Sequence, residues 1–123
     1  LTIRMALNNR FAVFVAFDAG NLRPVAELLR ALYPASPLLV CADDDWQTKG
    51  NPGVTKATEI TKRVPYAHLI YPVFTGKRGA KDTDFNDLQA ASGLVTVARQ
   101  FQGPLAYMGR LSVRAPEVLS HAA

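Results

Sequence analysis

Apolar runs of strand length alternate with stretches of helical periodicity along this chain of 123 residues. The run at 11–17, FAVFVAF, consists of small, β-branched and aromatic residues, which is typical of a strand covered on both faces. Runs of the same kind occur at 38–42, LLVCA, and at 68–74, HLIYPVF. Because parallel neighbours need crossover connections, such alternation indicates βαβ units. The sequence therefore predicts a three-layer α/β fold with a mainly parallel sheet and flanking helices.

Helices are expected before, between and after these runs. Apolar spacing and capping residues predict helices at 1–7, at 22–32, from Asn51 to Val64, at 84–92 and from 94 to about 102. In the third of these, Pro52 stands at the first helical position, which it favours. The remaining segment, 103–123, is expected to form a helix or a linker.

Composition sets limits on the class of protein. With 49% hydrophobic residues, the chain has enough apolar material for one core. The formal net charge of +4 suits a polyanionic partner, although a basic, solvated surface explains it equally well. The lone Cys41 lies in an apolar run, which favours a buried structural thiol in a reducing compartment. No apolar stretch reaches the roughly 18 residues needed to cross a bilayer, so we expect a cytoplasmic protein without a membrane partner.

The stretch CADDDWQTKGNPG, at 41–53, places three carboxylates directly after an apolar run. Like charges within about 4–6 Å disfavour one another unless a cation neutralises them. Asp43 and Asp45 are two residues apart, so an extended backbone would direct both to one side and Asp44 to the other. A second acidic group, Asp84 and Asp87, follows the third apolar run. Because ligands of parallel α/β sheets bind at the carboxyl ends of strands, both groups are candidates for one site.

Hard carboxylate oxygens suit Mg²⁺, which is usually held by one or two carboxylates together with substrate phosphates. The chain has no cluster of His and Cys residues, which argues against zinc. A structural interpretation stands beside the metal site: the triplet is a solvated turn, Thr83 or Asp84 caps a helix, and Asp87 complements the helix dipole. The residues alone leave both open.

Basic side chains flank the acidic groups, and the candidates for contact with a nucleic-acid backbone are Lys49, Lys56, Lys77 and Arg78. The alternative is that they are scattered surface cations. Trp46, directly after the acidic triplet, either stacks on a base or packs against its own loop.

Several of these motifs together resemble the Toprim domain of bacterial-type primases, topoisomerases and some nucleases. The matching motifs are ADDD at 42–45, NPGVTKA at 51–57 and TDFNDL at 83–88. With VAFDAGNLRPVAELLRALYP at 15–34, they look like the Toprim domains of plasmid- and phage-type DNA primases, including those of conjugative plasmids. The resemblance covers about 11–102, and we expect 1–102 to form a Toprim-like domain.

The resemblance implies a site and an activity. Asp43 and Asp45 would correspond to the catalytic, metal-binding aspartates, and Asp84 with Asp87 to the later acidic motif at the same metal site. The metal would be Mg²⁺ or Mn²⁺, and the reaction would be nucleotidyl transfer that makes RNA primers. The partners would be a single-stranded DNA template and nucleoside triphosphates, with a helicase or other primase domains as further candidates. Lys56 would face a phosphate or the acidic cluster.

The chain departs from the family pattern at one point. The family has a glutamate at the end of its first strand, and this chain starts inside what looks like the following helix, so we expect that strand and its glutamate to lie upstream. Two alternatives therefore remain: a nuclease or topoisomerase module on the same fold, or a noncatalytic, truncated Toprim unit that binds nucleic acid or a partner.

Overall fold

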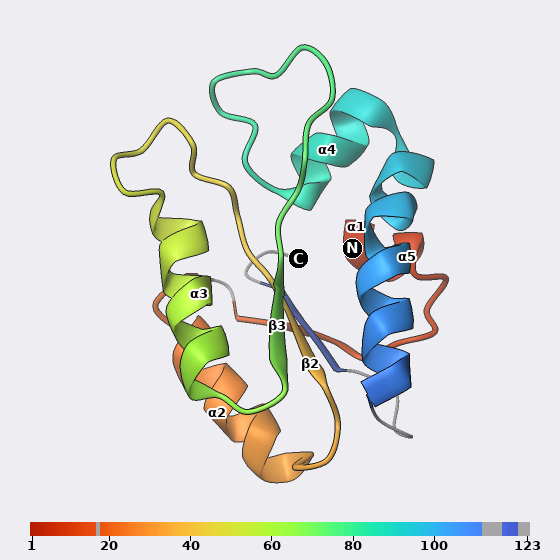
Figure 1. Ribbon diagram of the computed structural model, residues 1–123. Coiled ribbons are helices and arrows are strands. Elements are labelled where there is room, and N and C mark those ends of the chain that lie inside the picture. Colours follow the sequence, from red (N-terminus) through yellow and green to blue (C-terminus); the bar gives the residue numbers. More distant parts are fainter. Residues whose placement is uncertain (17, 112–116, 121–123) are drawn as a thin grey trace.

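The structure, a computed structural model, describes residues 1–16, 18–111 and 117–120 (Figure 1). Its helices and strands follow in the order α1 (Thr2–Ala6), β1 (Val13–Val15), α2 (Leu22–Leu32), β2 (Leu38–Cys41), α3 (Pro52–Arg63), β3 (Ala67–Ile70), α4 (Phe85–Ser92), α5 (Leu94–Leu111) and β4 (Glu117–Ser120). The fold is α/β, as the alternation in the sequence predicts.

The four strands form one sheet in the order β1-β4-β2-β3, and every neighbouring pair is parallel. Helices cover both faces of this sheet, with α2 and α3 on one side and α1, α4 and α5 on the other (Figure 1). The predicted three-layer arrangement is therefore confirmed.

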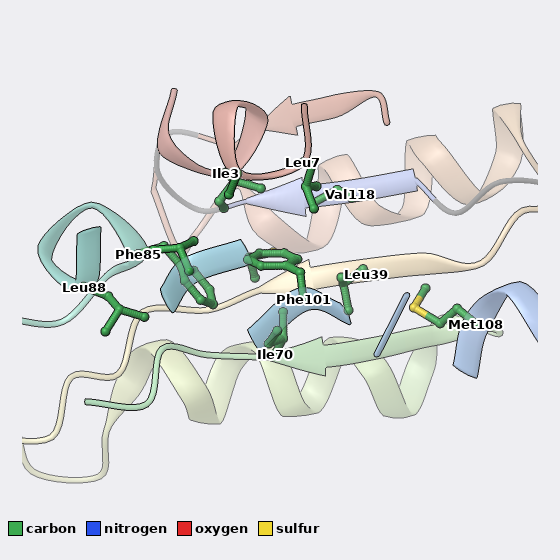
Figure 2. Packing of buried hydrophobic residues seen from close by; sticks show 12 residues of the cluster. Ile3, Leu7, Leu39, Ile70, Phe85, Leu88, Phe101, Met108 and Val118 are labelled. Atoms are coloured by element: carbon green, nitrogen blue, oxygen red, sulfur yellow. The ribbon is translucent and has the colours of Figure 1, made fainter. Parts of the chain in front are cut away.

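Alternate residues of the central strands supply the two halves of the core. In β2, Leu38 and Val40 pack with α2 and α3, whereas Leu39 and Cys41 pack with α1, α4 and α5. Figure 2 shows the second of these layers, in which Phe101 of α5 lies against the sheet. Because successive side chains of a strand point to opposite faces, a strand that is apolar throughout must be covered on both sides. All four residues of β2 are buried, as this requires.

The last strand, β4, lies in a segment that was expected to be a helix or linker. It occupies the centre of the sheet, where Val118 is paired with Val13 on one side and with Leu39 on the other. Its Val118 and Leu119 are fully buried, one in each core layer. A run of four residues with only two large apolar side chains carries little strand signal by itself. Its conformation is fixed by hydrogen bonds to strands that are distant in the sequence.

Helix α5 also continues past its expected end near residue 102, through Pro104 to Leu111. A proline inside a helix removes one hydrogen bond and costs about 3 kcal/mol. Phe101 and Met108 lie on one face of α5, two turns apart, and both are fully buried in the same core layer. Past the proline, Met108 is fully buried and Leu105 packs against the same layer; burying a large apolar side chain contributes about 1.5–3 kcal/mol, which offsets the cost of the proline.

The other boundaries differ by a few residues from those predicted. The strand expected at 68–74 is regular over Ala67–Ile70, and the one expected at 11–17 over Val13–Val15, with residue 17 outside the described part. Helix α3 begins as predicted: Asn51 is its N-cap, and its side chain accepts a hydrogen bond from the N–H of Val54. In the described part of the chain, no helix combines the length and apolar character that a membrane span requires.

Candidate carboxylate site

The carboxyl ends of the strands form one aligned row. Val15 and Cys41 are both paired with Ser120, and Cys41 is also paired with Ile70. The loops that follow β2 and β3 therefore leave the sheet from the same edge (Figure 1). Both acidic groups identified in the sequence lie in or next to these loops.

A backbone hydrogen bond joins the two acidic groups. The N–H of Asp44 donates to the carbonyl oxygen of Thr83 at 2.7 Å, so the loop after β2 contacts the chain immediately before α4. Asp43 and Asp84, which are far apart in the sequence, thereby come to line one small recess of about 10 Å³. Its other lining side chains include those of Asn86 and the buried Ser120, at the end of β4. The recess has room for little more than one water molecule.

The charges in this recess disfavour one another. Burial raises the pKa of Asp84 above its ordinary value, and the negative charges of Asp87 and Asp43 raise it further. A cation between Asp43 and Asp84 would relieve the repulsion and compensate for lost hydration. The electrostatics of the recess are compatible with a bound cation, and the metal site stays a prediction.

Asp84 and Asp87 also organise the start of α4. The Asp84 carboxylate accepts from the N–H of Asp87 at 2.8 Å, and the Asp87 carboxylate accepts from the N–H groups of Thr83 at 2.8 Å and Asp84 at 3.1 Å. This reciprocal arrangement is a capping box. The predicted helix-capping role is therefore confirmed. It is compatible with a second role for Asp84, since a carboxylate offers about four acceptor positions.

Asp45 does not line the recess with Asp43. Its carboxylate accepts a 2.8 Å hydrogen bond from the N–H of Gly53, in the first turn of α3, and its own N–H donates to the Asn51 side chain at 2.9 Å. A Cβ at position 53 would collide with the carbonyl oxygen of Asp43, so only glycine permits this close approach. Asp45 thus anchors to α3 the loop after β2, which carries residues 43–45 and which we call the acidic loop.

The donor set fits Mg²⁺ or Mn²⁺ in one respect: two hard carboxylates, Asp43 and Asp84, converge, and such ions need only one or two from the protein. Within the described ranges, no group of three or more His, Cys, Asp or Glu side chains is placed to hold a metal ion. Any ion at this edge would therefore take its remaining ligands from water or substrate.

Arg78, a candidate for contact with nucleic acid, is engaged in hydrogen bonds and aromatic contacts within the protein. Its guanidinium donates to the Asp44 carboxylate at 2.8 Å and to the Asp44 and Asp82 carbonyl oxygens at 3.0 and 2.9 Å. Its Cζ lies 4.3 Å from the ring centroid of Phe74 and 4.9 Å from that of Trp46. These contacts tie the loop after β3 to the acidic loop.

The other basic candidates are solvent-exposed. Lys49 lies on the loop after β2 and Lys77 on the loop after β3. Both loops leave the carboxyl edge of the sheet, where Asp43 and Asp84 converge, and we call it the acidic edge. Lys56 lines a groove of about 210 Å³ between α2 and α3, which also receives the side chains of Arg23, Arg63 and Glu59. We call this the α2–α3 groove. Three cations against one carboxylate make its lining basic, although Arg23 also pairs with Glu27 at 2.8 Å.

Three features of this edge have no counterpart in the sequence interpretation. The contacts of Arg78 and the entry of Arg23 into the groove join segments that no local pattern connects. Ser120 belongs to a strand that periodicity does not reveal. The Asn-Pro pair before a helical stretch did signal a helix start at Asn51. In the structure the Asn51 side chain caps α3 and also donates to the Asp44 carboxylate at 2.6 Å.

The sheet and its edge define the class: a parallel α/β domain with carboxylates gathered where such folds bind their ligands. The chain is similar to two Escherichia coli proteins, each named DNA primase TraC. It is 46% identical to one over 77 residues and 39% identical to the other over 83 residues, which are 59% and 64% of this chain. These similarities relate the chain to DNA primases.

The matched segments are 7% and 6% of the lengths of those two proteins. No family model matches the chain. No solved structure matches it significantly.

Proposed function

We propose that this chain is a Toprim-type catalytic module of a DNA primase, which makes RNA primers on single-stranded DNA by metal-dependent nucleotidyl transfer. One observation carries the proposal: Asp43 and Asp84 converge in one recess at the carboxyl edge of a parallel sheet. Carboxylates at the edge of a sheet can serve several reactions. The similarity to proteins named DNA primase supports primer synthesis among them.

In this proposal Asp43 and Asp84 hold Mg²⁺ or Mn²⁺. When bound, the metal would neutralise the nucleotide phosphates and stabilise the charge that develops during phosphoryl-group transfer. Asp45 and Asp87 hold the first two in place, because their carboxylates accept backbone N–H groups of α3 and of the chain before α4. The carboxylate of Asp45 or Asp87 would bind the metal through an acceptor position that these hydrogen bonds do not use.

The template strand would bind through its phosphates to exposed cations around the edge, namely Lys49, Lys77 and Lys56. Such contacts supply most of the affinity of proteins for single strands without regard to sequence. A helicase or other primase domains remain predicted partners.

The decisive experiment is a calorimetric titration of Mn²⁺ and Mg²⁺ into the wild-type chain and an Asp43→Asn/Asp84→Asn variant. Both substitutions preserve shape, and asparagine also caps helices, so α4 should keep its start. The matched control is Asp18→Asn/Glu27→Gln, which removes the same charge near α2, where Asp18 accepts from Asn21 and Glu27 pairs with Arg23.

We expect saturable binding by the wild type and the control, and its loss in the recess variant. Equal binding by all three proteins would contradict the assignment of the metal to Asp43 and Asp84. If the metal binds as expected, the wild type should extend RNA on a single-stranded template with nucleoside triphosphates. Metal binding without any such synthesis would leave a metal site but contradict the primase activity of this chain.

A further inference from the structure

The indole ring of Trp46 is held in place directly after the acidic triplet at 43–45. The backbone N–H of Trp46 donates to the carbonyl oxygen of Asp44 at 2.8 Å, which makes a tight turn directly after the acidic triplet. The side chain is 43% exposed, although Arg78 lies over its ring with Cζ at 4.9 Å from the centroid. Part of the indole therefore packs within the protein, and part of it is open to solvent.

Arg78 is itself fixed, so the support under the indole is rigid. Its guanidinium is held by Asp44 and by the carbonyl oxygen of Asp82, and it contacts the Phe74 ring at 4.3 Å. Only 18% of the Arg78 side chain is exposed. A ring that is oriented before a ligand arrives loses little conformational freedom on binding, which is the condition for an effective stacking platform.

We propose that Trp46 is a stacking site for a nucleobase, belonging either to a nucleoside triphosphate or to a single strand bound at the acidic edge. The proposal deepens the proposed function and rests on it. Every base has a π-face, so an indole binds bases with little regard to sequence. The arginine contact also enriches the ring's environment with positive charge, which suits a polyanionic ligand.

The position of Trp46 fits this role. Three peptide units separate it from Asp43, so their Cα atoms lie within about 11 Å of each other. A nucleotide whose phosphates are held near Asp43 would then have its base in the neighbourhood of the indole. Lys49 and Lys77, exposed on the two flanking loops, are available for further phosphates.

The chain offers a direct readout because Trp46 is its single tryptophan. We would follow its fluorescence while adding a 16-nucleotide oligo(dT) strand, or ATP with Mg²⁺, as separate titrations. Quenching by the oligonucleotide identifies a template base, and quenching by ATP identifies the base of an incoming nucleotide. Either result supports the proposal.

Affinity is then measured by the anisotropy of a fluorescein-labelled oligonucleotide, and for ATP by calorimetry, with three variants. Loss of one stacked base weakens binding by about five- to 150-fold, and we expect this for Trp46→Leu. Trp46→Phe should keep part of the affinity, and it provides a test should the leucine variant fold poorly. The matched control is Tyr107→Leu, since Tyr107 is similarly exposed, at 50%, but contacts His68, at the opposite end of β3.

Several outcomes would overturn the proposal. If the wild type binds either probe without quenching and all variants bind equally, stacking is wrong while the proposed function stands. If neither probe binds, both the stacking site and the substrate assignment are wrong. If Tyr107→Leu weakens binding as much as Trp46→Leu, the effect is general and no specific role belongs to Trp46.

Discussion

Arg78 and Asp44 form an ion pair with 2.8 Å between Nη1 and Oδ2, although 34 residues separate them in the sequence. Their side chains are only 18% and 15% exposed. The pair joins the loop after β2 to the loop after β3, and the aromatic rings of Trp46 and Phe74 pack on the same guanidinium. The acidic edge is therefore held together by a cation that belongs to the protein.

Replacing Arg78 by alanine should destabilise the fold. The substitution leaves the largely buried Asp44 carboxylate with its hydrogen bond from Asn51 but without its cation, and it removes two bonds to carbonyl oxygens, which we expect to cost about 1–3 kcal/mol. Urea unfolding followed by circular dichroism measures the change. The matched control is Arg23→Ala, which breaks the exposed pair with Glu27 and should leave the unfolding midpoint unchanged. Equal effects of the two variants would contradict the bridging role of Arg78.

Gly53→Ala should displace the acidic loop. The new methyl group would collide with the Asp43 carbonyl oxygen and lie 2.9 Å from the Asp45 carboxylate, so α3 and the loop must separate. We expect lower stability together with weaker Mn²⁺ binding. Gly103→Ala is the control: nothing lies near its Cβ, it is within α5, and alanine should stabilise the helix by about 0.5–1 kcal/mol. Opposite shifts of the two unfolding midpoints would confirm the close approach at Gly53.

Leu119→Ala tests whether β4 is part of the core. Leu119 is fully buried on the face of the sheet that α2 and α3 cover, so its truncation should cost about 2–5 kcal/mol. Leu28→Ala makes the same chemical change on a side chain that is 57% exposed and should be nearly neutral. Denaturant unfolding of both variants gives the comparison. A small effect at Leu119 would mean that the C-terminal strand is dispensable.

Cys41 should resist thiol reagents in the folded protein. Its side chain is buried in β2, and burial raises the pKa of the thiol well above its ordinary value. Since the thiolate is the reactive form, N-ethylmaleimide should modify Cys41 only when the structure opens. Mass spectrometry of samples taken over time, with and without urea, measures this. Rapid modification without denaturant would contradict the burial of β2.

The α2–α3 groove should contribute to the binding of single-stranded DNA. A Lys56→Glu/Arg63→Glu variant is expected to bind more weakly and to show a shallower salt dependence, by about 0.7 in the logarithmic slope for each lost phosphate contact. The matched control is Arg4→Glu/Arg99→Glu, which makes the same change of charge on α1 and α5, across the sheet. If both variants lose equal affinity, only net charge matters and the groove has no special part.

The sequence predicted the elements whose pattern is local. Continuous apolar runs marked the cores of β1, β2 and β3, and Asn51 with Pro52 marked the start of α3, because strand burial and helix capping depend on residues close together in the chain. The edge of the sheet that carries the carboxylates followed from the same alternation, since parallel strands put their carboxyl ends together.

The tertiary structure decided the rest. It placed β4 between β1 and β2 and carried α5 past Pro104, because the energy for both comes from burial against distant elements rather than from local propensity. It also separated the acidic residues, bringing Asp43 to Asp84 while Asp45 bonds to α3 and Asp44 to Arg78. Spacing determines which residue types can gather at an edge. Which oxygens meet there depends on contacts between loops more than 30 residues apart, and no local pattern contains that information.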